Sequence, residues 1–232
     1  LKNNRMGNIL FESFMKKTLA THIRLLCILI LSNIIIFCKT LYERNEQKNL
    51  ILVNVENPLP EEYSVDLSEI TEGVMVADRI EKQLVKMIQD AEDDGVYLKV
   101  VSGYRTMEEQ HQLYVDEIQL FLDEGYTKKE AENMAKQWVA VPGTSEHQTG
   151  LAVDINAMED KSTGEEAYLW LAYHAQEYGF IRRYPPDKVN ITGIANEPWH
   201  YRYVGKKAAI EMKNENKCLE EYIGAENGRE TR

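Results

Sequence analysis

The sequence predicts an α+β fold. Helical and extended patterns follow one another irregularly from about residue 76, without the repeated strand-helix-strand unit that builds a parallel sheet. Short apolar runs at 97–101, 151–155 and 180–183 are typical of strands, and stretches of helical periodicity separate them. The chain has 232 residues, 44% of them apolar, which is enough for one globular domain.

The first predicted helix covers residues 78–94. Gly95 provides its C-terminal stop. The apolar residues that recur at helical spacing are Ile80, Leu84, Met87, Ile88 and Ala91. A strand at 97–101 then delivers the sequence Ser102-Gly103-Tyr104-Arg105 to its end, where side chains often face a site.

Two further helices are predicted at 106–123 and 127–138. Each begins with a capping box, in which a Thr and a Glu three residues later satisfy two backbone N–H groups: Thr106 with Glu109, and Thr127 with Glu130. After a loop at 141–144, a buried strand is predicted at 151–155. A helix at 165–178, closed by Gly179, precedes the strand at 180–183.

An apolar run near the N-terminus predicts a membrane signal. It extends from Leu25 to Cys38, is preceded by Lys16, Lys17 and Arg24, and falls short of the roughly 20 residues of a full span unless its neighbours extend it. No small-x-small cleavage site follows, so we interpret residues 1–39 as a cytoplasmic tail with a single-pass signal anchor. The positive-inside rule then makes 40–75 an extracytoplasmic tether and 76–232 the extracytoplasmic domain. A cleaved signal peptide and secretion, or a buried helix of a cytosolic protein, are the alternatives.

Composition restricts the partners. The net charge of −11 disfavours nucleic acid and anionic membrane surfaces as partners, because both are negatively charged and bind positively charged protein surfaces. A neutral or zwitterionic small substrate fits better. Cys27 and Cys38 lie in the apolar run, so Cys218 has no disulfide partner within the domain. The absence of coiled-coil heptads makes a monomer the simplest expectation.

Two short motifs predict a zinc site. In the first, His147 on a loop precedes Asp154 on a strand, Gly150 lets the backbone turn between them, and Ala152 leaves room on the face of Asp154. In the second, Glu197 lies three residues before His200. Catalytic zinc keeps three protein ligands and a water. We therefore predict Zn²⁺ bound by His147, Asp154 and His200, with Glu197 as the general base.

Arg105 supplies a fixed cation that can stabilise an oxyanion or hold a substrate carboxylate. Ser145 could donate a hydrogen bond to the same end of the substrate, and Gln110 could contact its backbone. Together with Tyr104 they are the candidate substrate-binding residues. Glu146, between Ser145 and His147, is a less favoured base than Glu197 because Glu197 is the neighbour of His200.

The chain resembles the zinc D-Ala-D-Ala carboxypeptidases of the VanY type, within a group that includes D,D-dipeptidases and L,D-carboxypeptidases. The resemblance covers roughly residues 50–225 and rests on three blocks in order, at 102–110, 145–154 and 197–205. It implies the same ligand set, the same base and Arg105 as electrostatic stabiliser. It also implies a Hedgehog/D,D-peptidase-like fold, in which a small antiparallel sheet flanked by helices holds the zinc. Arg183, Tyr184 and Thr192 would border the substrate cleft.

The activity that the resemblance implies is removal of the C-terminal D-Ala from peptidoglycan stem peptides at the outer face of a bacterial cell membrane. L,D-cleavage of tetrapeptide stems is the runner-up, and an endopeptidase acting within the stem remains open. A second class of function, a non-catalytic module that binds stem peptides, is also an alternative, although an inactive relative would be expected to have lost Glu197 or a ligand.

Overall fold

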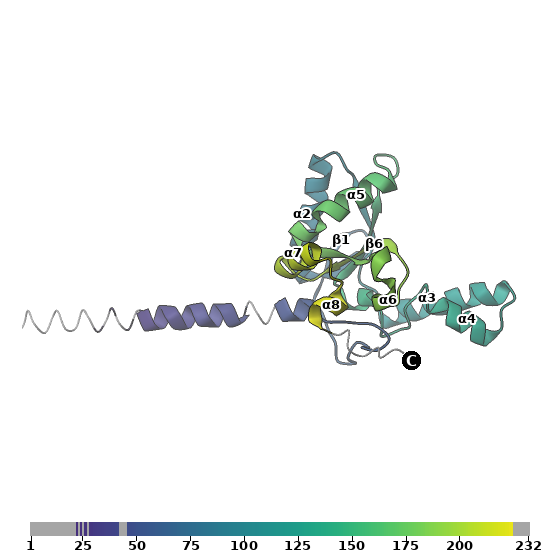
Figure 1. Ribbon diagram of the computed structural model, residues 1–232, viewed down its shortest axis with the longest axis horizontal. Coiled ribbons are helices and arrows are strands. Elements are labelled where there is room, and N and C mark those ends of the chain that lie inside the picture. The colour runs from purple at the N-terminus through teal and green to yellow at the C-terminus, as the bar shows by residue number, and fades with distance from the viewer. Residues whose placement is uncertain (1–21, 23, 25, 27, 42–45, 225–232) are drawn as a thin grey trace, which may run out of the picture. The chain divides into compact units, whose positions relative to one another are not determined.

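A four-stranded antiparallel sheet carries the functional part of the chain (Figure 1). The computed structural model describes residues 22, 24, 26, 28–41 and 46–224. The chain divides into two units, residues 1–48 and 49–232, and the second contains the sheet and every element labelled below.

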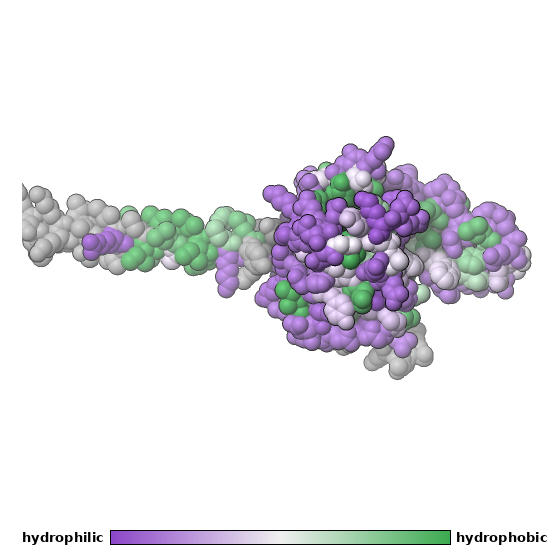
Figure 2. All heavy atoms as spheres, turned by 90° about the horizontal axis from the view of Figure 1, so that it is seen from above, coloured by the Kyte–Doolittle hydropathy of each residue, from purple (hydrophilic) through white to green (hydrophobic). Residues whose placement is uncertain are grey.

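In the first unit, residues 28–41 are helical, and large apolar side chains such as Ile35 and Phe37 are exposed there (green in Figure 2). Of the predicted tail and anchor, residues 1–39, positions 1–21, 23, 25 and 27 lie outside the described residues. Among the residues that are described, no helix combines the length and the apolar character needed to cross a membrane.

Residues 49–75, the larger part of the tether predicted at 40–75, belong to the second unit. Val53 is buried, and the Leu59 amide donates to the Gly143 carbonyl at 2.7 Å. Strands β1 (Leu67–Thr71) and β2 (Val74–Ala77) pair with each other in an antiparallel ribbon. The polar, Pro-containing composition of this segment did not indicate that it folds with the domain, because the segment is held by contacts with residues far along the chain.

The sheet has the strand order β3-β4-β6-β5. β3 (Leu98–Ser102), β4 (Ala152–Ala157) and β5 (Phe180–Tyr184) confirm the three predicted strands within one or two residues. β6 (Glu197–Tyr203) was recognised only as a motif. All neighbours are antiparallel, and the register places Asp154 opposite both Ser102 of β3 and His200 of β6.

Side chains alternate between the two faces of the sheet, so that one face packs in the core and the other carries the site. Val153 and Ile155 of β4 and Tyr201 of β6 join the main apolar core, so Asp154 and His200 point to the other face of the sheet. The core is closed by α2 (Asp78–Asp93), through the apolar residues predicted from its sequence, and by α5 (Gly164–His174).

Capping chemistry sets the helix starts as predicted. Both expected capping boxes are formed, on α3 (Met107–Asp123) and α4 (Lys128–Ala135), which form a helical hairpin that projects from the sheet (Figure 1). The chain leaves α4 earlier than the predicted end at Trp138, through a turn at 136–138. The predicted helix at 165–178 is α5 followed by the 3₁₀ turn η2 (Ala175–Tyr178).

The remaining elements are short or close the C-terminal side. They are η1 (Glu146–Thr149), η3 (Pro186–Lys188), α6 (Val189–Thr192), α7 (Lys206–Glu215) and α8 (Leu219–Ile223). A second apolar cluster joins β5, α7 and α8 through Ile181, Met212 and Leu219.

Candidate metal centre

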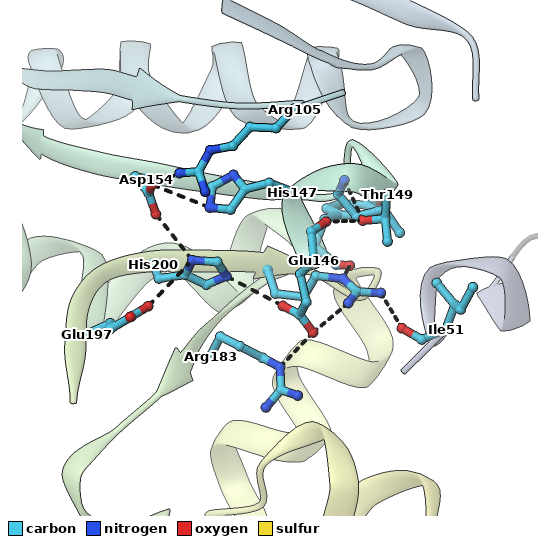
Figure 3. Close-up of polar contacts among 12 residues, drawn as sticks. Ile51, Arg105, Glu146, His147, Thr149, Asp154, Arg183, Glu197 and His200 are labelled. Atoms are coloured by element: carbon cyan, nitrogen blue, oxygen red, sulfur yellow. Dashed lines mark hydrogen bonds and ion pairs between the residues drawn. The ribbon is translucent and has the colours of Figure 1, made fainter. Parts of the chain in front are cut away.

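The three predicted ligands meet. Ligand atoms of His147, Asp154 and His200 lie within 4.8 Å of one another, and all three residues are buried. Asp154 lies between the two rings, with Oδ2 3.3 Å from His147 Nε2 and Oδ1 3.2 Å from His200 Nδ1 (Figure 3). Two imidazoles and one carboxylate are the donor set of an open zinc site, so the residues fit that metal.

Local backbone structure places His147. The turn η1 ends at Gly150, whose φ of +69° is in the left-handed region that favours glycine. The Gly150 carbonyl accepts from the Ala77 amide at 2.9 Å, and a Cβ on Gly150 would lie 3.0 Å from that same nitrogen. The turn is therefore held against the start of α2, and a side chain at position 150 would disturb it.

Each imidazole has its second nitrogen directed at an acceptor. His147 Nδ1 lies 2.7 Å from the Gly103 carbonyl, which can only accept, so Nδ1 carries the proton and the Nε2 lone pair faces Asp154. His200 Nε2 points instead towards Glu146 Oε2 at 3.5 Å. An outer hydrogen bond such as that of His147 to Gly103 orients a metal-bound histidine.

Burial and neighbouring charge shift the ionisation of all three ligands. Burial lowers the pKa of His147. Burial also disfavours a charged His200, but the hydrogen bond to Asp154 and the negative charges of Asp154 and Glu146 outweigh it and raise the pKa of His200 to about 9. Burial acts against the Asp154 carboxylate, yet the two histidines hold its pKa well below the usual range.

Glu197 lies beside the ligands without joining them. Its Oε2 is 3.7 Å from His200 Nδ1, and its side chain is 21% exposed, at the start of β6. Burial, helped by the charges of Asp154 and Glu146, raises the pKa of Glu197. A carboxylate that is partly accessible and more basic than usual is suited to take a proton from water.

Arg105 is held in place by its neighbours. Its Nη2 donates to Asp154 Oδ2 at 3.0 Å and to Ser102 Oγ at 2.9 Å, and its Nε also donates to Ser102 Oγ. Gln110 accepts a longer bond from Nη1, at 3.4 Å, and donates to the Ala140 carbonyl at 2.7 Å. Gln110 is thus buried with both ends of its amide engaged, so it supports Arg105.

The ligands open onto a cleft of about 440 Å³. Ser145, Gln110, Arg105 and Glu197 line it, but Tyr104 is not among its lining residues. The lining residues include two exposed tryptophans, Trp138 and Trp199. Arg183, Tyr184 and Thr192, which the family resemblance placed at the border, line the cleft as well.

Glu146 is the functional-site residue whose place the sequence did not show. It is buried and bridges Arg183 and Arg202, with Oε1 2.8 Å from Arg183 Nε and 2.7 Å from Arg202 Nη1. Burial works against its ionisation, but the two guanidinium groups lower the pKa of Glu146 far below its ordinary value. Both partners lie more than 35 residues away, so no local pattern could have revealed the contact.

A family model described as VanY, D-alanyl-D-alanine carboxypeptidase, matches residues 73–206. The chain belongs to this family. A D-alanyl-D-alanine carboxypeptidase of Enterococcus faecalis is 50% identical to it over 181 residues, covering 78% of this chain and 68% of the relative. The putative carboxypeptidase YodJ of Bacillus subtilis is 36% identical over 196 residues, with the same coverage.

Solved structures of VanY-family proteins share the fold. VanYB in complex with D-alanine-D-alanine is 50% identical and has a TM-score of 0.74, covering 77% of this chain and 99% of that one. A mutant VanY from a VanB-type resistance cassette, in complex with Zn(II), has a TM-score of 0.73, covering 76% and 99%. The predicted family, fold and zinc cofactor are confirmed.

The L,D-carboxypeptidase LdcB is also similar, at 35% identity and a TM-score of 0.64, covering 76% of this VanY-family chain and 86% of LdcB. One fold therefore accommodates both D,D- and L,D-cleavage among the relatives of this chain, and the fold alone does not distinguish the two substrates.

Proposed function

We propose that this chain is a zinc-dependent D,D-carboxypeptidase that removes the C-terminal D-Ala from peptidoglycan stem peptides. One observation carries the proposal: the His147, Asp154 and His200 cluster lies in a cleft together with Glu197 and Arg105. The 50% identity to the E. faecalis D-alanyl-D-alanine carboxypeptidase supports this substrate over that of LdcB, which is only 35% identical.

The residues of the site divide the chemistry among them. When bound, zinc polarises a carbonyl group and lowers the pKa of water. Glu197 accepts the proton of the attacking water and later delivers it to the leaving amine of D-Ala. Arg105, held by Ser102 and Asp154, stabilises the negative charge that develops on the carbonyl oxygen. The cleft beyond these groups receives the rest of the stem peptide.

The decisive experiment incubates the zinc-loaded chain with a stem pentapeptide and a stem tetrapeptide and identifies products by mass spectrometry. The proposal expects loss of one alanine from the pentapeptide alone. Loss from the tetrapeptide alone would assign L,D-cleavage, and internal cleavage would assign an endopeptidase. No cleavage of either peptide, with zinc bound, would favour the non-catalytic binding module.

Glu197→Gln tests the assignment of the base. Glu197 is not part of the ligand cluster, so the variant should keep its zinc. Its kcat should fall by about 10²–10⁴-fold, the range that general acid–base catalysis contributes. Glu92→Gln, which alters an exposed carboxylate on α2, is the matched control and should remain fully active. A zinc-bound, active Glu197→Gln variant would remove Glu197 from this role.

We also propose that the apolar N-terminal segment anchors the enzyme in the bacterial membrane and that the extracytoplasmic domain acts as a monomer. The basic residues before the run and the exposed apolar side chains of residues 28–37 support the anchor. Fractionation of cells that express the whole chain or residues 46–232 tests it, because only the whole chain should sediment with membranes. Light scattering of the purified chain tests the monomer.

A further inference from the structure

We propose that Glu146 is a positioning residue that fixes the ring of His200 with the proton on Nε2, so that Nδ1 is the nitrogen offered to zinc. The inference rests on the zinc site of the proposed function and concerns a residue outside the ligand set. Glu146 acts as part of a buried group of four charges, here called the Glu146 cluster: Glu146, Arg183, Arg202 and Glu220.

The two oxygens of Glu146 have different neighbours (Figure 3). Oε1 accepts hydrogen bonds from Arg183 Nε and Arg202 Nη1, at 2.8 and 2.7 Å. Oε2 lies 3.5 Å from His200 Nε2. Among the described residues, neither Oε2 nor His200 Nε2 has a hydrogen-bond partner, although both atoms are fully buried. Each is therefore the partner that the other needs.

The guanidinium groups cannot turn to release Oε1. Arg183 makes a two-pronged contact with Glu220, at 2.9 and 2.7 Å. Arg202 donates from Nη2 to the carbonyls of Asn49 and Ile51, at 3.1 and 2.7 Å. All four side chains of the cluster are buried, and their charges balance. The cluster is thus a rigid support with one free acceptor, directed at His200.

The two carboxylates face different nitrogens of His200. Nδ1 lies within hydrogen-bond distance of Asp154 Oδ1, at 3.2 Å, and Nε2 faces Glu146 Oε2. A zinc ion bound by Nδ1 would replace the hydrogen on that atom, and because a carboxylate can only accept, the hydrogen that faces Glu146 would stay on Nε2. His147 follows the same rule with the other nitrogen, because the Gly103 carbonyl takes Nδ1–H and leaves Nε2 facing Asp154.

Glu146→Gln removes the acceptor for His200 Nε2–H with almost no change in shape. Because two guanidinium donors need an acceptor, the amide oxygen must take the Oε1 position and the amide nitrogen must face His200 Nε2. The amide nitrogen donates, so His200 should accept at Nε2 and carry its hydrogen on Nδ1, the atom that zinc requires. Loss of an outer partner of a metal-bound histidine typically lowers metal affinity by about 10–100-fold.

Glu220→Gln is the matched control. Glu220 belongs to the same buried cluster, and its substitution removes the same charge. Its carboxylate accepts hydrogen bonds from Arg183 and contacts no metal ligand. Zinc affinity of the full chain is measured by competition with a chelator, and the hydrogen bond of His200 Nε2–H by ¹H–¹⁵N NMR of the zinc-loaded protein. We expect Glu146→Gln to lose about 10–100-fold in zinc affinity and to lose the low-field shift of a hydrogen-bonded Nε2–H. Glu220→Gln should match the wild type in both.

Equal zinc affinity in Glu146→Gln and the wild type, or an equal loss in the two variants, would overturn the proposal, since the second result would reflect general destabilisation. If Glu146→Gln does not fold, the double variant Glu146→Gln with Arg202→Met restores the charge balance and keeps the Arg183 donor, and the same loss is expected. A wild-type chain that binds no zinc would refute the proposed function as well, whereas a zinc-binding wild type with an unaffected variant would refute this inference alone.

Discussion

A methyl group at Gly103 should disable the zinc site from outside the ligand set. An ideal Cβ at this position would lie 2.2 Å from the Met75 carbonyl oxygen and 3.1 Å from Val74 Cγ1. Real Cβ contacts essentially never fall below 3.0 Å, so the Gly103 and Met75 backbones must separate by at least 0.8 Å. The Gly103 carbonyl is the acceptor for His147 Nδ1, and Arg105 follows two residues later.

The largest effect can be worked from that separation. If Gly103 takes all of it along the direction of the 2.7 Å bond, the distance from His147 Nδ1 to Gly103 O becomes 3.5 Å, the limit of a hydrogen bond. Leaving a buried N–H without a partner costs about 1–3 kcal/mol. The typical loss of metal affinity when such an outer contact is removed, about 10–100-fold, is of the same magnitude.

Competition with a chelator measures the affinity of Gly103→Ala for zinc, and a peptide hydrolysis assay measures kcat. Gly125→Ala is the control: no atom lies within 4 Å of the Cβ position of Gly125, whose φ is +94°. The control should lose about 1–2 kcal/mol of folding stability through backbone strain and keep its zinc affinity. A Gly103→Ala variant with wild-type zinc affinity would refute the argument that this close approach holds His147 in place.

Three further outcomes follow from the structure. Because the pKa of His200 is raised to about 9, the zinc-free protein keeps the imidazole protonated below pH 9. Zinc must displace that proton, so apparent zinc affinity should rise with pH up to that value. At pH 6, calorimetry in buffers of different ionisation enthalpy should show about one proton released per zinc, and buffer-independent heats would contradict this. Arg105→Lys should keep zinc but lower kcat by about 10²–10³-fold, because an ammonium cannot hold Ser102 and Asp154 in the same forked geometry, and wild-type kcat would exclude this role. Thr163→Ala removes the N-cap of α5 and should cost about 1 kcal/mol in urea unfolding without altering zinc affinity.

Much of the fold and of the site could be predicted from local patterns. The periodicity of α2 and the capping boxes of α3 and α4 depend on residues within one or two turns, so the sequence displays them directly. The ligands were predictable for a similar reason. His147 and Asp154 lie in one short motif, and the Glu197-to-His200 motif supplies the rest of the chemistry.

The contacts between distant segments could be seen only in the tertiary structure. Residues 49–75 read as a tether because their burial depends on partners such as Gly143, which no local pattern announces. Gln110 was expected to meet substrate, yet its amide is engaged by Arg105 and Ala140. Glu146 looked like a weak candidate for the base, and its partners Arg183 and Arg202 lie 37 and 56 residues along the chain. Sequence alone therefore determined which side chains can bind zinc, because ligand chemistry belongs to side chains and short motifs. Only the fold determined which nitrogen of each histidine faces the metal centre, because the Gly103 carbonyl and Glu146 Oε2, brought in from distant segments, lie against the other nitrogen.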